Sequence, residues 1–180
     1  VQNIINQTPR GNIAGDGSGR QRFQNMTANL RKTNTTYVNY YDKAVRAFNK
    51  NNNDEARSLA TQAIAADRSQ PAFHSLIGFI ALRKDLDSEA RRSFQQALSI
   101  DPNYQPSLRG MGAAEYFSRN YNQGINHLKK SVALFPDDAP SRYFLGLCYY
   151  KTASYRSAIE QLKEFAEAQP KHPRIHGILG

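Results

Sequence analysis

The sequence contains a single cysteine, Cys148, among its 180 residues. One cysteine cannot close an internal disulfide, and this one stands in an apolar stretch, where we expect a small buried residue rather than a reactive thiol. Long hydrophobic runs are also missing. No stretch of eighteen apolar residues occurs, and the first thirty residues lack the apolar segment of a signal peptide. We therefore predict no membrane-spanning helix, and targeting signals do not indicate a compartment.

The motifs of common catalytic and metal sites are absent too. No His-Glu-x-x-His occurs, and although His172 and His176 stand four residues apart, Pro173 lies between them and no third ligand is evident. The glycine-rich run 11–19 is not closed by Gly-Lys-Ser/Thr, so it is better explained as a flexible linker than as a phosphate-binding loop. We predict that the chain is not an enzyme and holds no metal or cofactor.

Acidic residues are few relative to basic ones, 15 against 24, which gives a formal net charge of +9. Residues 1–36 hold five of the basic residues and only one acidic residue, so the excess is concentrated at the N-terminus. No block of five consecutive Lys or Arg residues is present. A solvated linker is therefore favoured, with a nucleic-acid-binding arm as the less favoured alternative.

What the sequence does contain is a repeat of 34 residues. Gly78, Gly112, Gly146 and Gly180 stand at this interval, and so do three prolines and a series of small residues. The prolines are Pro102, Pro136 and Pro170, and the small residues are Ala56, Ala90, Gly124 and Ala158. Four frames follow, 37–70, 71–104, 105–138 and 139–172.

Each frame has the pattern of two helices. In the second frame, apolar residues recur at helical spacing on both sides of a polar turn at 84–87, and the step at Asp101 and Pro102 ends the second helix. A glycine inside a helix costs about 1 kcal/mol relative to alanine. Its repetition at 78, 112 and 146 predicts that the two helices approach closely there, with the small residues of the second helix facing it.

These residues resemble the tetratricopeptide repeat (TPR), which has a small residue at repeat positions 8 and 20 and proline at position 32. The resemblance covers residues 37–180, with Ala44 at position 8 of the first frame. It implies an all-α, right-handed superhelical array of helical hairpins, an α-solenoid, that binds other proteins. Two residues depart from the pattern: Arg68 stands where proline is usual, and Phe165 stands where the other frames have Ala63, Ala97 and Ser131.

The flanking segments complete the predicted organisation. Residues 1–18 are polar and are expected to form a flexible linker or extended segment. Residues 19–36 carry Phe23, Met26 and Leu30 at helical spacing, which predicts a helix that caps the first hairpin. Residues 173–180 are the start of a fifth repeat or a partial C-terminal cap helix.

The TPR resemblance also implies a binding site, because the concave groove of such arrays is lined by positions 2, 5, 9, 12 and 13 of the first helices. These positions give an aromatic surface with three cations, which fits an extended apolar peptide, including one with an acidic end. Two alternatives stay open: the rings pack against neighbouring helices, or the groove is filled by residues 1–18 or by another domain. The candidate residues are Tyr41, Val45, Phe48, Ser75, Phe79, Leu82, Arg83, Arg109, Ala113, Tyr116, Phe117, Tyr143, Leu147, Tyr150 and Lys151.

A second resemblance concerns the parent protein. The stretches 23–31 and 37–44 are similar to the junction before the C-terminal TPR region of bacterial extracytoplasmic HExxH zinc metalloproteases. This implies a periplasmic or otherwise extracytoplasmic protein whose partners include a protease domain of the same parent chain. The alternatives are a free-standing TPR scaffold for secretion or pilus assembly, and a cytoplasmic location.

Overall fold

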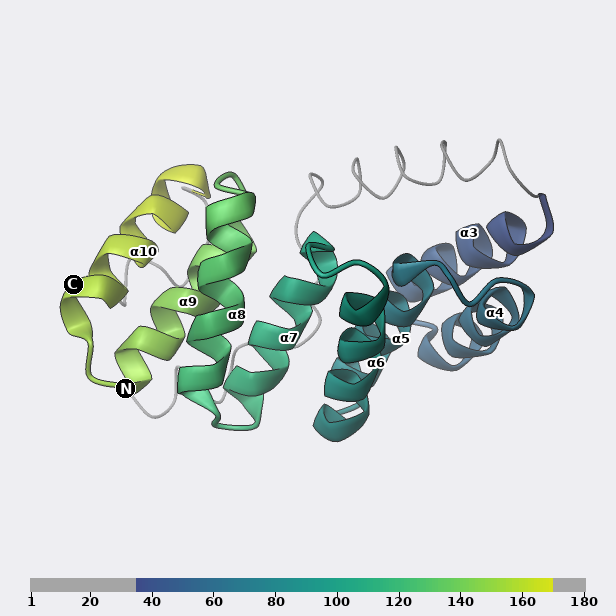
Figure 1. Cartoon of the computed structure of the whole chain (residues 1–180), viewed down its shortest axis with the longest axis horizontal. Helices are drawn as coiled ribbons and strands as arrows, with labels where there is room; N and C mark the ends of the chain where they lie inside the picture. Colours follow the sequence, from purple (N-terminus) through teal and green to yellow (C-terminus); the bar gives the residue numbers. More distant parts are fainter. Residues whose placement is uncertain (1–34, 170–180) are drawn as a thin grey trace.

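The computed structural model describes residues 35–169, and within them the chain is entirely helical (Figure 1). The predictions for residues 1–34 and 170–180, including the capping helix and the fifth repeat, lie outside this range. Each of the four 34-residue frames holds one helical hairpin, and the all-α prediction is confirmed. The helices are α3 (Thr35–Asn49), α4 (Asn53–Ala66), α5 (Pro71–Arg83), α6 (Asp87–Ile100), α7 (Gln105–Phe117), α8 (Tyr121–Leu134), α9 (Ala139–Lys151) and α10 (Tyr155–Ala168).

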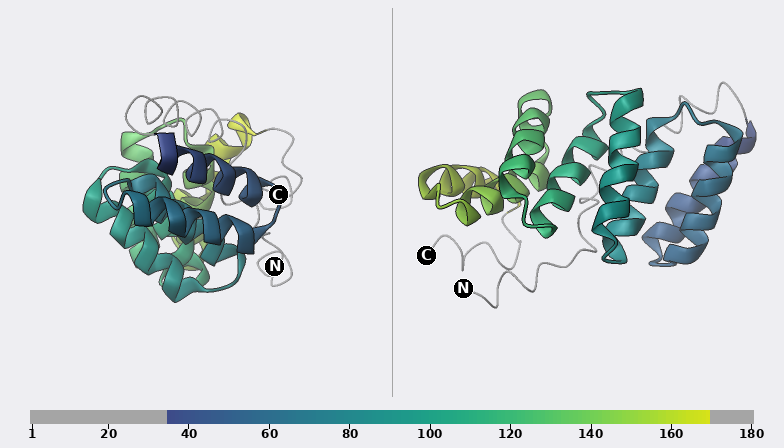
Figure 2. Two further views of the ribbon diagram at one scale, coloured as in Figure 1. Left: turned by 90° about the vertical axis from the view of Figure 1, so that its right-hand side faces the viewer. Right: turned by 60° about the horizontal axis from the view of Figure 1, so that its bottom comes forward.

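The hairpins stack side by side into an elongated two-layer array, seen from one end and from a tilted direction in Figure 2. The first helices of the hairpins, α3, α5, α7 and α9, each contact the next first helix. Within residues 35–169 no second helix, α4, α6, α8 or α10, contacts another second helix. Because the first helices are closer together than the second helices, the array curves towards its first helices, and their inward side is its inner face.

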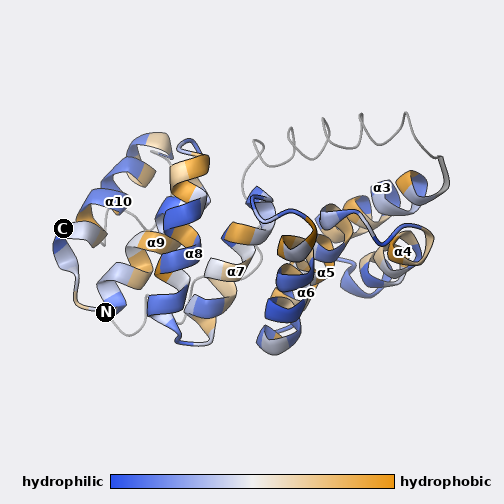
Figure 3. Ribbon diagram, in the orientation of Figure 1, coloured by the Kyte–Doolittle hydropathy of each residue, from blue (hydrophilic) through white to orange (hydrophobic). Residues whose placement is uncertain are grey.

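The first helices contribute most of the buried core. Ten of the 13 residues of α7 are buried, whereas only three of the 14 residues of α8 are. A first helix such as α7 contacts the second helices on both sides and the neighbouring first helices as well. A second helix such as α8 contacts only first helices among the described elements, so it keeps one face in water. Much of α6 and α8 is accordingly hydrophilic in Figure 3.

At the glycines inside the first helices, a side chain of the second helix packs directly against the backbone of the first. A Cβ atom added at Gly78 would lie 2.6 Å from Cε1 of Phe94, and one at Gly112 would lie 2.3 Å from Cγ of Leu128. Gly146 has the same relation to Leu162, at 2.7 Å. The predicted close approach is confirmed, and its main partner is the large side chain at repeat position 24 rather than the small residue at position 20.

A left-handed residue stands two positions after the end of each first helix. Asn51, Asp85, Arg119 and Ala153 have φ values between 59° and 63°, and they stand 34 residues apart. The residue that follows each of them donates its backbone N–H five residues back along the chain, as in the 3.0 Å bond from Leu86 to the carbonyl of Ala81. This is the Schellman arrangement, which usually has glycine at the left-handed position. The sequence predicted the turn but gave no signal for this conformation, because no glycine is used.

Replacing Ala153 with glycine is expected to stabilise the chain by about 0.5–1 kcal/mol, because glycine adopts positive φ without the steric cost of a Cβ. The measurement is the midpoint of chemical unfolding. The matched control is Ala133→Gly, an exposed position inside α8, which should destabilise by about as much. A loss of stability at position 153 similar to that at 133 would contradict the left-handed assignment.

Arg68 replaces the usual proline without loss of the turn between hairpins. The carboxylate of Asp67 accepts a hydrogen bond of 2.8 Å from the backbone N–H of Ser69, and Asp101 does the same for Asn103 at 2.9 Å. The Ser69 hydroxyl also donates to the Asp67 carboxylate, at 2.6 Å. This bond is the largest cause of a pKa of Asp67 below its usual value. An aspartate that closes the turn in this way makes the proline dispensable.

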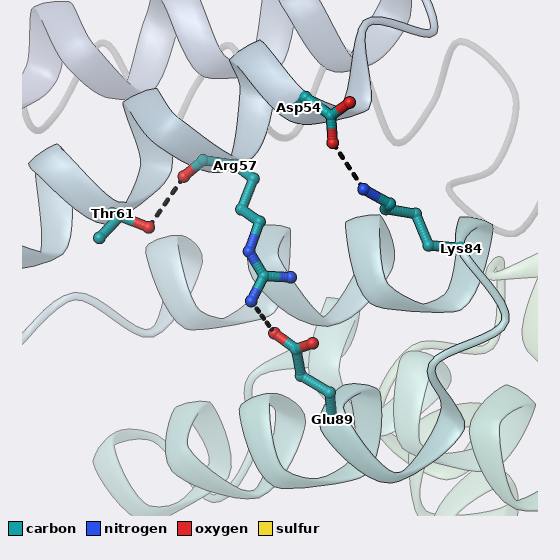
Figure 4. Close-up of polar contacts among 5 residues, drawn as sticks. All are labelled: Asp54, Arg57, Thr61, Lys84 and Glu89. Carbon is teal, nitrogen blue, oxygen red and sulfur yellow. Dashed lines mark hydrogen bonds and ion pairs between the residues drawn. The ribbon is translucent and has the colours of Figure 1, made fainter.

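Ion pairs connect the first two repeats at the surface, as Figure 4 shows. Arg57 of α4 contacts Glu89 of α6 at 2.5 Å, and Lys84 contacts Asp54 at 2.5 Å. Because these side chains are partly exposed to water, such pairs contribute little to stability. The junction between repeats is therefore held mainly by apolar packing.

Candidate interaction face

The fifteen residues predicted to line the groove all belong to the first helices, and we refer to them as the inner-face set. The structure divides them by burial. Val45, Arg83, Phe117, Tyr150 and Lys151 are half-buried. The others are buried, with exposed fractions of at most 8%: Tyr41, Phe48, Ser75, Phe79, Leu82, Arg109, Ala113, Tyr116, Tyr143 and Leu147.

Near the N-terminal end of the array, inner-face residues join α3 to α5. The rings of Tyr41 and Phe73 have centroids 4.9 Å apart. The guanidinium of Arg83 lies 3.4 Å from the centroid of the Phe48 ring, and its Nη1 donates a 2.5 Å hydrogen bond to the Phe48 carbonyl. Burial lowers the pKa of Arg83, but an arginine stays charged in proteins. Arg83 thus binds the last turn of α3, where a cation is favourable.

In the middle of the array, Arg109 forms a buried ion pair. Its Nη1 donates to Oδ1 of Asp138 at 2.7 Å, and both side chains are 4% exposed. The other carboxylate oxygen of Asp138 accepts from the Ser141 hydroxyl, which contacts the Ser131 hydroxyl at 2.9 Å. The Arg109 guanidinium also lies 5.8 Å from the centroid of the Phe79 ring. This cation, which the sequence suggested for a ligand carboxylate, has a carboxylate of its own chain.

Asp138 is the residue of this site that sequence reasoning missed. It is the last residue of its frame, where the two preceding frames have Gln70 and Tyr104. A carboxylate at a repeat position where the two preceding frames have uncharged residues is the sequence signal that could have pointed to Asp138.

Towards the C-terminal end of the array, aromatic side chains of the inner-face set pack between the helices. The Tyr116 ring lies 5.5 Å from Phe117 and 5.8 Å from both Tyr121 and Phe144, between centroids. The unusual Phe165 lies 5.0 Å from Tyr143 of the same hairpin. These contacts favour the interpretation in which many inner-face rings pack against neighbouring helices, and they leave Tyr150 and Lys151 nearer the surface.

Three buried hydroxyls of the inner-face set, those of Tyr41, Ser75 and Tyr116, have no hydrogen-bond partner among the described residues. Burial raises the pKa of Tyr41 and Tyr116 well above the usual value, so both phenols stay protonated. Buried hydroxyls without partners are uncommon, because their loss of hydration is uncompensated.

The described residues contain no cluster of three or more His, Cys, Asp and Glu side chains that could hold a metal. Burial raises the pKa of Cys148 to about 12, so its thiol stays protonated and unreactive. Burial likewise lowers the pKa of His127. His172 and His176 lie outside the described range. Within that range, no helix combines the length and apolar character needed to cross a membrane.

Several solved structures have a similar fold. MamA from Desulfovibrio magneticus RS-1 is 20% identical, with a TM-score of 0.71 over 81% of this chain and 82% of that one. PilF of Pseudomonas aeruginosa is 16% identical, with a TM-score of 0.73 over 79% of this chain and 65% of that one. A chain of the APC/C hetero-tetramer Cut9–Hcn1 is 21% identical, with a TM-score of 0.74 over 81% of this chain and 29% of that one. At these identities the similarity shows the fold alone.

The sequence itself carries the family assignment. Among curated proteins no sequence matches this chain significantly. Two profiles described as tetratricopeptide repeat match it, one over residues 41–104 and the other over residues 118–180, which together span more than two thirds of its length. The chain belongs to the tetratricopeptide repeat family.

Proposed function

We propose that this chain is a protein–protein interaction module whose inner face binds a polypeptide segment. Tetratricopeptide repeats serve as protein-binding modules, which supports the general function. The observation that carries the specific site is the inner-face set itself. It presents half-buried apolar and aromatic side chains, those of Val45, Phe117 and Tyr150, on the first helices of the array. Rigid aromatic side chains provide a large contact area at low entropic cost.

The charges of the inner face favour an uncharged segment. Arg109 is paired with Asp138, and Arg83 is bound to the carbonyl and ring of Phe48. Lys151 is half-buried and forms no ion pair within the described part of the chain. One available ammonium group accommodates a single carboxylate better than an acidic run. The proposed ligand is therefore an extended, largely apolar segment, with at most one acidic group near α9.

Changing Tyr150 to alanine and Lys151 to glutamate together should weaken peptide binding at least about fivefold, since truncating an anchor residue typically costs about 1–4 kcal/mol. Binding is measured by fluorescence anisotropy with a panel of synthetic apolar and acidic-ended peptides. The matched control changes Leu134 to alanine and Lys129 to glutamate, both exposed on α8, and should bind within about twofold of the unaltered chain. Equal losses in the two folded double variants would move the site off the inner face.

The wider context also remains a proposal. The similarity of residues 23–31 and 37–44 to the junction of extracytoplasmic zinc metalloproteases supports a role as the TPR region of such a protease. The alternative, a free-standing scaffold, is supported by the similarity to a chain from a hetero-tetramer. Reading the coding sequence on both sides of this region for His-Glu-x-x-His decides between them, and its absence from the whole gene excludes the protease.

A further inference from the structure

In α5, α7 and α9, the side that faces the preceding hairpin is apolar. Gly110 of α7 packs against Phe94 of α6, and a Cβ atom added there would lie 2.3 Å from the ring. Cys148 of α9 lies next to Gly124 of α8, whose added Cβ atom would be 3.1 Å from the Cys148 Sγ. These contacts place repeat positions 6 and 10 on the side of the preceding hairpin, and position 7 lies beside them. At these three positions α5, α7 and α9 carry only apolar residues, glycine and cysteine included.

The first helix of the described array, α3, departs from this pattern. Its residues at the same three positions are Asp42, Lys43 and Arg46. Lys50 follows Arg46 by about one turn, and its backbone N–H donates a 3.1 Å hydrogen bond to the Arg46 carbonyl. Asp42 is half-buried, and the three cations are exposed. Since burying an unpaired charge is costly, this side of α3 does not form the apolar junction that joins the other hairpins.

The surface formed by Lys43, Arg46 and Lys50, which we call the α3 end face, is separate from the inner face. Among the described elements α3 contacts only α4 and α5, and it stands at one end of the array (Figure 1). None of the three cations takes part in an ion pair within residues 35–169. With 3.6 residues per turn of helix, they lie on the side of α3 opposite to its inner-face residues.

We propose that the α3 end face is a second binding surface, which takes an acidic helix of a partner protein. In the other three repeats the same side of the first helix is occupied by a helix, the second helix of the preceding hairpin. The shape of this side therefore accepts a helix. The cations recur at intervals of three and four residues, which is also the spacing of residues along one side of a partner helix. Glutamates at this spacing would pair with all three cations.

The charge pattern favours an acidic helix over nucleic acid. The three cations span about 10 Å along α3 and the turn after it, whereas a nucleic-acid site neutralises more phosphates and stacks bases on exposed rings. The exposed residues between positions 37 and 50 include no aromatic side chain. Asp42, which stands beside the cations in the sequence, would also repel a phosphate backbone.

The test uses the full chain and a fluorescent, alanine-rich helical peptide with glutamates at intervals of three and four residues. Its control peptide has glutamine in place of each glutamate. At low ionic strength the chain should bind the acidic peptide at least about tenfold more tightly than the control peptide, as measured by anisotropy. Changing Lys43, Arg46 and Lys50 together to glutamate should abolish this preference, because the altered face repels the carboxylates that it paired with.

The matched control changes three exposed cations of the second helices, Arg92, Lys129 and Lys163, to glutamate. It alters the net charge equally and should keep the preference within about twofold of that of the unaltered chain. A variant with glutamine at positions 43, 46 and 50 should lose the preference without introducing repulsion, and circular dichroism shows that each variant is folded. Equal losses in the two charge-reversed variants, or equal binding of the two peptides by the unaltered chain, would overturn the proposal.

Two further measurements locate the bound peptide and identify its class. Carbodiimide coupling should join glutamates of the peptide to Lys43 or Lys50, and coupling to other lysines alone would contradict the proposed surface. A single-stranded DNA oligonucleotide that binds more tightly than the acidic peptide, and is released by the same charge reversal, would replace the proposal with a nucleic-acid site. Changing Tyr150 and Lys151 of the inner face should leave acidic-peptide binding within about twofold, so this proposal and the proposed function fail independently.

Discussion

Changing Asp138 to asparagine is expected to lower the free energy of unfolding by about 3–5 kcal/mol, the cost of removing one partner from a buried ion pair. Arg109 and Asp138 are each 4% exposed, so the guanidinium would lose its counter-charge where water cannot replace it. The Ser141 hydroxyl, which donates to the same carboxylate, would lose a charged acceptor. Chemical denaturation of the purified variant gives the value.

The control for this prediction is Glu89→Gln, which breaks the surface pair with Arg57. That change should cost less than about 1 kcal/mol, because the side chains are 41% and 29% exposed. A third variant, Arg109→Met with Asp138→Leu, should be more stable than Asp138→Asn, since replacing a whole buried pair by apolar groups is often neutral. If Asp138→Asn were as mild as Glu89→Gln, the pair would not be the buried junction described above.

Gly110→Ala is expected to destabilise the chain by about 2–3 kcal/mol through overpacking. A Cβ atom there would lie 2.3 Å from both Cε1 and Cζ of Phe94, a side chain that is 0% exposed. The ring cannot move away freely, because the space on its other side is taken by Gly78, whose added Cβ would lie 2.6 Å from it. Phe94 therefore joins its own hairpin to the next one through two glycines.

A double-mutant cycle makes this prediction specific. Phe94→Leu alone should cost about 1 kcal/mol, since leucine stands at the same repeat position in the next two hairpins and fills less space. Combined with Gly110→Ala it should recover part of the loss, with a coupling of at least about 1 kcal/mol. Strict additivity of the two changes in thermal or chemical unfolding would show that the glycine and the ring do not compete for the same space.

The sequence predicted the fold well because period and helix packing are linked. Gly78, Gly112 and Gly146 recur where a side chain of the second helix occupies the space of a Cβ, so the packing requirement is visible as spacing. The left-handed residues were not predicted. Arg119 and Ala153 carry no chemical sign of their conformation, which is imposed by the hairpin geometry.

The candidate site was less predictable, because it depends on contacts between distant residues. Repeat numbering placed Arg109 on the inner face, but its partner Asp138 comes 29 residues later and reaches it only through the stacking of two hairpins. Helical periodicity likewise marks a position as inward-facing without indicating how deeply it is buried. Tyr116, which the sequence suggested as a ligand anchor, is held by three other rings and is 5% exposed.

The most direct test of the inner face as the binding surface is site-specific photo-crosslinking. Benzoylphenylalanine is placed in the full chain at the half-buried inner-face positions Val45 and Tyr150, and at the exposed Leu134 of α8 as the outer control. Each chain is irradiated with the tightest-binding peptide of the panel, and the products are mapped by mass spectrometry. We expect peptide adducts from one or both inner-face positions and none from position 134. Adducts from position 134 alone would contradict the proposed function.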